Sequence, residues 1–78
     1  MKISYDPRYN IAYIRLREAG TEVKTIHVSD EVNVDISPDG KIYGIELLNA
    51  NEQLQIMDEG ELSFTDESTG KTIQFSIR

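Results

Sequence analysis

Apolar and polar residues alternate with a period of two along most of the chain, a pattern typical of half-buried β-strands. Ten isoleucines, four valines and five threonines among 78 residues also favour strands over helices. Turn-forming residues separate the alternating segments, so we predict that consecutive segments form hairpins. The predicted strands are residues 2–6, 11–17, 22–28, 32–36 and 42–48, one around Leu62 and Phe64, and one from Ile73 to Ile77.

The turn at residues 37–40 has proline at its second position and glycine at its fourth, which suits a type I turn. Pairing Ile36 with Lys41 around this turn sets Val34 opposite Tyr43 and groups the apolar residues on one face. A shift by one residue would mix the two faces, because successive side chains point to opposite sides of a strand. The sequence therefore predicts the pairing of Ile36 with Lys41, unless a bulge intervenes.

The period changes after the fifth predicted strand. Apolar residues recur at spacings of four and three, as on one face of a helix, at Ala50, Leu54 and Met57. Asn49, followed three residues later by Glu52, resembles a helix-capping arrangement, and Gly60 is a plausible stop. We therefore predict a short helix from Asn51 to Asp58.

Together these elements predict an α+β fold, a mainly antiparallel β meander of six to seven strands with one short helix. We expect a single sheet, with the helix covering part of one face, and a single small domain over residues 1–78. The predicted core comprises Ile3, Tyr5, Ile14, Leu16, Val34, Ile36, Ile45, Leu47, Leu54, Met57, Phe64 and Phe75.

Charge and composition narrow the function classes. Eight basic and fourteen acidic residues give a net charge of −6, which repels nucleic acid backbones and anionic membranes. The chain has no cysteine, so it has no disulfide, no thiolate zinc site and no cysteine nucleophile. Because no segment resembles a signal peptide or a transmembrane span, we expect a cytoplasmic protein that binds neither nucleic acid nor membrane.

The stretch from Asp35 to Glu46 matches a calcium-binding loop pattern. Its positions 1, 3, 5, 6, 8 and 12 are Asp35, Ser37, Asp39, Gly40, Ile42 and Glu46. However, an EF-hand loop lies between helices, whereas both flanks here alternate like strands. In a hairpin Glu46 would lie about 20 Å from Asp39, far beyond a coordination sphere. We therefore predict no metal site and no cofactor.

His27 is the single histidine and a conceivable general base. No serine lies in a nucleophile motif, and strand alternation is expected to point Asp30 away from the histidine. A solvent-facing strand histidine is the favoured interpretation.

Three carboxylates, Asp35, Asp39 and Glu46, could also perform acid and base chemistry, but a domain this small has little room for a substrate cleft. Glu46 is the most interesting of the three, because Gly44 leaves space beside it on the same face. A solvent-facing role on a half-buried strand is nevertheless favoured for Glu46.

Tyrosines cluster around the first predicted hairpin, at Tyr5, Tyr9 and Tyr13, accompanied by Arg8, Arg15 and Arg17. Such a cluster could stack the bases of a single-stranded nucleic acid. Because the remainder of the chain is strongly acidic, we favour cross-strand aromatic packing or an interface anchor.

The first fifty or so residues resemble the YuzE-like family of small bacterial domains of unknown function. The resemblance rests on Lys2, Ile3, Tyr5, Asp6, Pro7, Tyr13, Ile14, Val32, Val34, Asp35, Asp39, Gly40, Gly44, Ile45 and Glu46. The chain departs from the family at Ala12, where leucine is usual, and at Asn10, where an acidic residue is common. The resemblance implies a small α+β protein with no established activity, cofactor or catalytic set. It also implies a protein-binding role, since members are associated with toxin-like partner genes.

These observations predict a small non-catalytic protein-interaction module, either the acidic partner of a toxin-like protein or a homo-oligomer. A thin core and open sheet edges favour association, and the terminal segment Thr72 to Arg78 is a candidate edge. Candidate binding residues are Tyr13, Asp35, Asp39 and Glu46. The alternative is a small hydrolase that uses His27 or Glu46.

Overall fold

The computed structural model describes residues 1–18, 20, 22–56 and 60–76. Seven strands and one helical turn make up this part of the chain, which confirms the predicted fold class. The elements are β1 (Lys2–Asp6), β2 (Ile11–Arg15), β3 (Lys24–Ser29), β4 (Val32–Ile36), β5 (Ile42–Leu48), α1 (Ala50–Gln53), β6 (Glu61–Asp66) and β7 (Lys71–Ser76).

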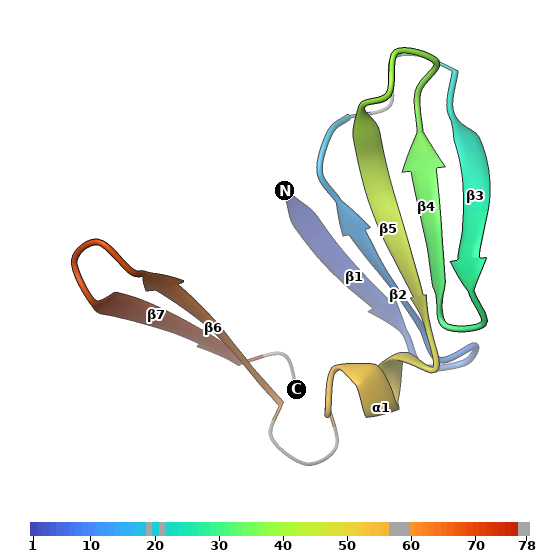
Figure 1. Ribbon diagram of the computed structural model, residues 1–78. Coiled ribbons are helices and arrows are strands. Elements are labelled where there is room, and N and C mark those ends of the chain that lie inside the picture. Colours follow the sequence, from blue (N-terminus) through green and yellow to red (C-terminus); the bar gives the residue numbers. More distant parts are fainter. Residues whose placement is uncertain (19, 21, 57–59, 77–78) are drawn as a thin grey trace.

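Five strands form one antiparallel sheet in the order β1-β2-β5-β4-β3, and β6 and β7 form a separate two-stranded sheet (Figure 1). The expectation of a single sheet made from consecutive hairpins was wrong in two respects. The strands divide between two sheets, and β2 pairs with β5 instead of β3. The central position suits β5, which is rich in apolar residues, whereas the fully exposed β3 lies at the edge.

The five-stranded sheet has two chemically different faces, because residues paired across strands share a face. We call the first the apolar face; it carries Ile3, Tyr5, Ala12, Ile14, Ile26, Val32, Val34, Ile45 and Leu47. We call the second the polar face; it carries Ser4, Tyr13, Arg15, Thr25, His27, Asn33, Asp35, Gly44 and Glu46.

The register of the β4–β5 hairpin differs from the prediction by one residue at Ile36 and by two residues beyond it. Ile36 pairs with Ile42, and beyond a bulge Val34 pairs with Ile45 instead of Tyr43. The loop closes between Ser37 and Lys41, whose backbone N–H and C=O lie 2.9 Å apart. A shift by two residues preserves the faces, so the apolar pattern could not reveal it.

The helix is shorter than predicted: α1 spans Ala50–Gln53 instead of Asn51 to Asp58, and residues 57 and 58 of the prediction lie outside the described part. Asn49 has a left-handed backbone with φ 53° and makes no side-chain hydrogen bond to the backbone of the first turn. Its amide donates to the Glu52 carboxylate instead, at 2.7 Å. The predicted capping pair is therefore a side-chain contact and not a reciprocal cap.

The core is smaller than predicted. Among the described apolar residues only Ala12, Ala50 and Ile56 are buried, and no large side chain is fully buried. Most predicted core residues of the sheet are half-buried, but four are exposed: Ile3, Leu16, Phe64 and Phe75. The exposure of Ile3 follows from the layering, since α1 is too short to cover the apolar face, whereas Phe64 and Phe75 lie on the separate β6–β7 sheet. Met57, also predicted to be in the core, lies outside the described residues.

The β6–β7 hairpin, predicted from the terminal alternation, is confirmed, but it stands away from the five-stranded sheet (Figure 1). Every residue of both strands is exposed. Leu62 pairs with Phe75 and Phe64 with Ile73, so the four apolar side chains share one face.

Asn10 joins the first hairpin to the start of α1. Its backbone has φ 56°, and its carbonyl accepts the N–H of Ala50 at 3.0 Å. Its side chain donates to the side-chain oxygens of Asn49 and Asn51 and accepts the Asn51 N–H at 2.8 Å. Asn10 thus fixes the place at which α1 begins.

Two substitutions of Asn10 separate the contribution of its left-handed backbone from that of its side-chain hydrogen bonds. Asn10→Gly keeps the left-handed backbone but removes the side-chain hydrogen bonds, and we expect it to lower the free energy of unfolding by about 1–2 kcal/mol. Asn10→Ala should lower it by about 1 kcal/mol more, because alanine resists a positive φ. Urea unfolding of both variants measures the difference, and equal stabilities of wild type and Asn10→Gly would contradict the assigned contacts.

Candidate functional site

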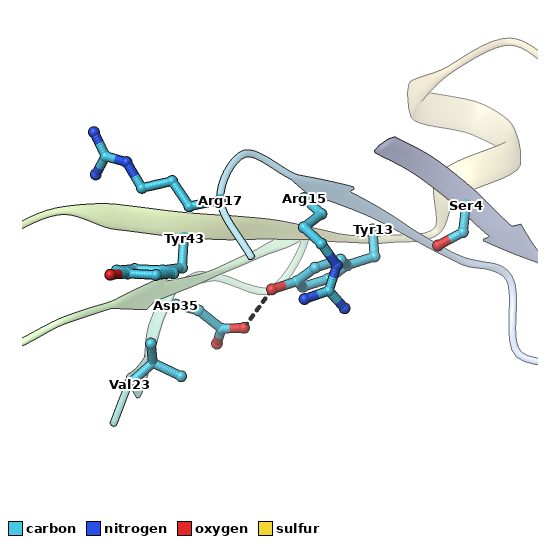
Figure 2. Close-up of a pocket in the computed structure, with 7 residues that line it drawn as sticks. All are labelled: Ser4, Tyr13, Arg15, Arg17, Val23, Asp35 and Tyr43. Atoms are coloured by element: carbon cyan, nitrogen blue, oxygen red, sulfur yellow. Dashed lines mark hydrogen bonds between the residues drawn. The ribbon is translucent and has the colours of Figure 1, made fainter. Parts of the chain in front are cut away.

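The centre of the polar face is a carboxylate held by two hydroxyls. Tyr13 on β2 donates its hydroxyl proton to one oxygen of Asp35 on β4 at 2.6 Å (Figure 2). Thr25 on β3 donates to the other oxygen at 2.7 Å. The tyrosine reaches Asp35 across β5, which lies between β2 and β4. Three strands are therefore connected through one carboxylate.

The absence of a side chain at Gly44 makes this reach possible. Gly44 pairs with Asp35 on one side and with Arg15 on the other, and a Cβ built on it would overlap the hydroxyl and ring of Tyr13. The space expected beside Glu46 is thus occupied by the Tyr13 ring. Gly44 is buried although it lies on a face open to solvent.

A second polar row crosses β3, β4 and β5. The Asn33 amide donates to Glu46 at 2.9 Å, and the Asn33 carbonyl oxygen lies 3.0 Å from Nδ1 of His27. Because a carboxylate only accepts hydrogen bonds, Glu46 fixes the orientation of the amide, and Nδ1 of His27 is then the donor. The structure thus links the two candidate hydrolase residues, His27 and Glu46, through Asn33.

The expected separation of His27 from Asp30 was wrong. Nε2 of His27 lies 3.8 Å from a carboxylate oxygen of Asp30, and both side chains are exposed. Asp30 belongs to the turn between β3 and β4 and not to a strand, so the alternation of strand side chains does not apply to it. An exposed pair of this kind contributes little to stability.

The fourth candidate, Asp39, lies away from this network, in the β4–β5 turn. Its carboxylate accepts the hydroxyl of Ser37 and lies 3.6 Å from the Lys41 ammonium. The Ser37 hydrogen bond lowers the pKa of Asp39 below its ordinary value. The structure therefore brings together Tyr13, Asp35 and Glu46, and leaves Asp39 to shape the turn.

Two arginines lie over two tyrosines beside the Asp35 carboxylate. The Arg15 guanidinium is 5.5 Å from the Tyr13 ring centre, and that of Arg17 is 6.0 Å from the Tyr43 ring centre. With Asp35 these side chains line a shallow hollow of about 410 Å³ (Figure 2). A cation above the face of an aromatic ring is attracted to it modestly, so each arginine is held over its tyrosine.

The predicted tyrosine cluster is divided between the faces of the sheet. Tyr5 pairs with Ala12 on the apolar face, Tyr13 lies on the polar face, and Tyr9 is exposed in the turn between β1 and β2. The prediction that these three rings pack against one another across strands was therefore wrong, and the rings do not form a shared stacking platform. The aromatic partner of Tyr13 around the hollow is instead Tyr43.

Sequence reasoning missed Thr25, Asn33 and Tyr43. The first two are polar residues at alternate positions of predicted strands, so their face could have been assigned, but their partners depend on which strands pair. Tyr43 joins the hollow because the β4–β5 register shifts at its position, where β5 carries one extra residue.

Within residues 1–18, 20, 22–56 and 60–76, no three histidine, aspartate or glutamate side chains are placed to hold a metal ion. No helix in the same part of the chain has the length and apolar character needed to cross a membrane.

The chain belongs to the family described as protein of unknown function (DUF2283), whose model matches residues 2–51. This match confirms the family resemblance noted in the sequence. No curated protein and no solved structure shows significant similarity to the chain. The matched part includes the whole five-stranded sheet and the polar-face network, whereas the β6–β7 hairpin lies beyond it.

The close approach of Tyr13 to Gly44 predicts a strong coupling between the two positions. Gly44→Ala should destabilise the protein by about 1–3 kcal/mol, because it displaces the ring from Asp35. In a Tyr13→Ala background the same change should be neutral or stabilising by about 0.5 kcal/mol, since alanine is the better strand residue. Urea unfolding of the four proteins measures the coupling, and Gly20→Ala, where a Cβ meets nothing within 4 Å, is the control.

The hydrogen bond to Asp35 raises the pKa of Tyr13 above the ordinary tyrosine value of about 10. A raised pKa in the folded state stabilises the protein at every pH below about 10 and is lost as the pH rises through the folded value. The stability difference between wild type and Tyr13→Phe should therefore be constant below pH 10 and shrink above it. Tyrosinate absorbance of both proteins should show that the highest-titrating tyrosine is missing from the variant; its persistence there would contradict the assignment.

Proposed function

We propose that this protein is a small non-catalytic protein-interaction module that binds through its apolar face and the β6–β7 hairpin. One observation carries the proposal, the exposure of large apolar side chains on both surfaces. Ile3 and Ile26 on the apolar face are 40% and 42% exposed, and Phe64 and Ile73 on the hairpin are 62% and 57% exposed. Exposed apolar surface gathered in this way is typical of interaction sites.

The polar face supports a non-catalytic role. Both oxygens of Asp35 accept hydrogen bonds, and Glu46 accepts one from Asn33. A general base needs a lone pair directed at a substrate proton, and the lone pairs used in these hydrogen bonds are directed at neighbouring side chains instead. The Tyr13 hydroxyl is likewise held as a donor by Asp35. We infer that the network fixes the positions of the strands.

The hydrolase alternative draws its support from the row that links His27 to Glu46 through Asn33. It is the weaker candidate, because no nucleophile accompanies the row and His27 is exposed. A hydrolase screen on wild type, His27→Ala and Glu46→Gln separates the two functions. Turnover that is present in wild type and lost in both variants would establish the enzyme.

The partner of the module is either another copy of the chain or a basic protein that complements the net charge of −6. The family association makes a toxin-like protein a candidate for the second case. A chain without cysteine suits the reducing cytoplasm, where we place the interaction.

Capture from the native cell tests the proposed function. Tagged wild-type chain, isolated at low salt, should carry a stoichiometric protein, either its own untagged copy or another chain. Phe64→Asp should lose it, because a charge would enter the apolar contact, whereas Ser63→Asp adds the same charge to the opposite face of the hairpin and should retain it. Recovery of no stoichiometric protein by wild type, or equal recovery by all three, would overturn the proposal.

A further inference from the structure

The chain exposes far more surface than a monomer of its size should. Its accessible area is 6035 Å², whereas a folded monomer of this mass exposes about 4,800 Å². Its radius of gyration is 14.1 Å, against about 11.5 Å for a compact chain of the same length. If two chains each buried the excess of about 1,200 Å², the interface would have the size of an obligate dimer.

The hairpin contributes an amphipathic surface that needs a cover. Leu62, Phe64, Ile73 and Phe75 form its apolar face, and serine, threonine, glutamine and one glutamate form the other. A two-stranded hairpin alone in water is marginally stable at best. Leu62, at the base of the hairpin, lies near Ile3 and Ile14 of its own sheet, but Figure 1 shows the rest of the hairpin directed away from that sheet, so the remainder of its apolar face needs a surface elsewhere.

The apolar face of the sheet offers such a surface. At its β1–β2 side the chain after α1 approaches it, and Leu54, Ile56 and Leu62 line a cavity of about 380 Å³ together with Ile3 and Ile14. Toward the opposite edge the face is open, and Ile26 is exposed there next to half-buried Val34. The two uncovered surfaces of the chain are thus an apolar hairpin face and an apolar sheet face.

From these observations we propose that two copies of the chain form a dimer by reciprocal exchange, in which the β6–β7 hairpin of each copy covers the open part of the apolar face of the other. The proposal rests on the proposed function and names its partner. A two-fold dimer makes the same contact twice and leaves neither surface uncovered.

Charge favours a second copy over a basic partner at this surface. The apolar face carries Lys24, which pairs with Ile36, and no acidic residue of β1 to β5 pairs within it. The hairpin face carries one charge of each sign at its tip, on the paired Asp66 and Lys71. A basic protein would find no acidic complement there, whereas the hairpin face, whose two charges cancel, brings no net charge against the apolar face.

Light scattering on the pure protein provides the first test. The wild-type particle should have twice the 8.9 kDa chain mass across micromolar concentrations. Phe64→Asp on the hairpin and Ile26→Asp on the sheet should each weaken dimerisation at least about 30-fold, as expected for a central interface residue. Ser63→Asp should leave the dimer intact. Circular dichroism of each variant verifies that it is folded.

Mixing the two defective variants identifies the contact. Phe64→Asp has an intact sheet face and Ile26→Asp has an intact hairpin, so the mixture should form a heterodimer in which one of the two contacts is wild-type. We expect this heterodimer to be tighter than either variant homodimer. A dimer between two sheets would survive Phe64→Asp, one between two hairpins would survive Ile26→Asp, and neither could be restored by mixing.

A wild-type monomer at all concentrations would overturn the exchanged dimer, whether the hairpin closes on its own sheet or remains open. So would a dimer that both variants retain, as expected for pairing through a strand edge. The capture experiment distinguishes this failure from that of the proposed function. If the pure chain is a monomer but recovers a different stoichiometric protein, which Phe64→Asp loses, the interaction module stands and the dimer does not.

Discussion

A single antiparallel sheet buries one face only if a second layer covers it, and this chain devotes almost nothing to that layer. Its one helical turn, α1, contributes buried Ala50, and Ile56 follows shortly after it. The half-buried state of the apolar face, the exposure of the hairpin and the excess of accessible area all follow from the missing layer. Association is the direct way for a 78-residue chain to complete it.

The polar face of the same sheet is organised by contacts between its own residues. Gly44 admits the ring of Tyr13, which connects β2 to β4 through Asp35. Three of the residues that carry the family resemblance therefore form one structural unit across three strands: Gly44, Tyr13 and Asp35. Sequence reasoning identified Tyr13, Asp35 and Glu46 as candidates but could not connect them, because their contact requires the pairing of β2 with β5.

The alternation of residues predicted the fold class and most strand positions, because each strand presents one apolar face. It could not determine the hairpin register, since a shift by two residues leaves every face unchanged and the bulge beside Ile36 has no apolar signature. It also placed Phe64 and Phe75 in the core, because periodicity shows which residues share a face and not what covers that face. The helix from Asn51 to Asp58 was overestimated for a related reason: apolar residues spaced four and three apart indicate a shared helical face, but they do not show that the backbone between them is continuously helical.

The central claim is that the β6–β7 hairpin of one chain covers the apolar face of another, and contacts between chains test it most directly. In a dimer reconstituted from ¹³C-labelled and unlabelled protein, isotope-filtered nuclear Overhauser spectra detect intermolecular contacts alone. The account predicts intermolecular cross-peaks between the Phe64 ring and the methyl groups of the apolar face, Ile26 among them. Their absence, with the same contacts appearing only within one chain, would contradict it.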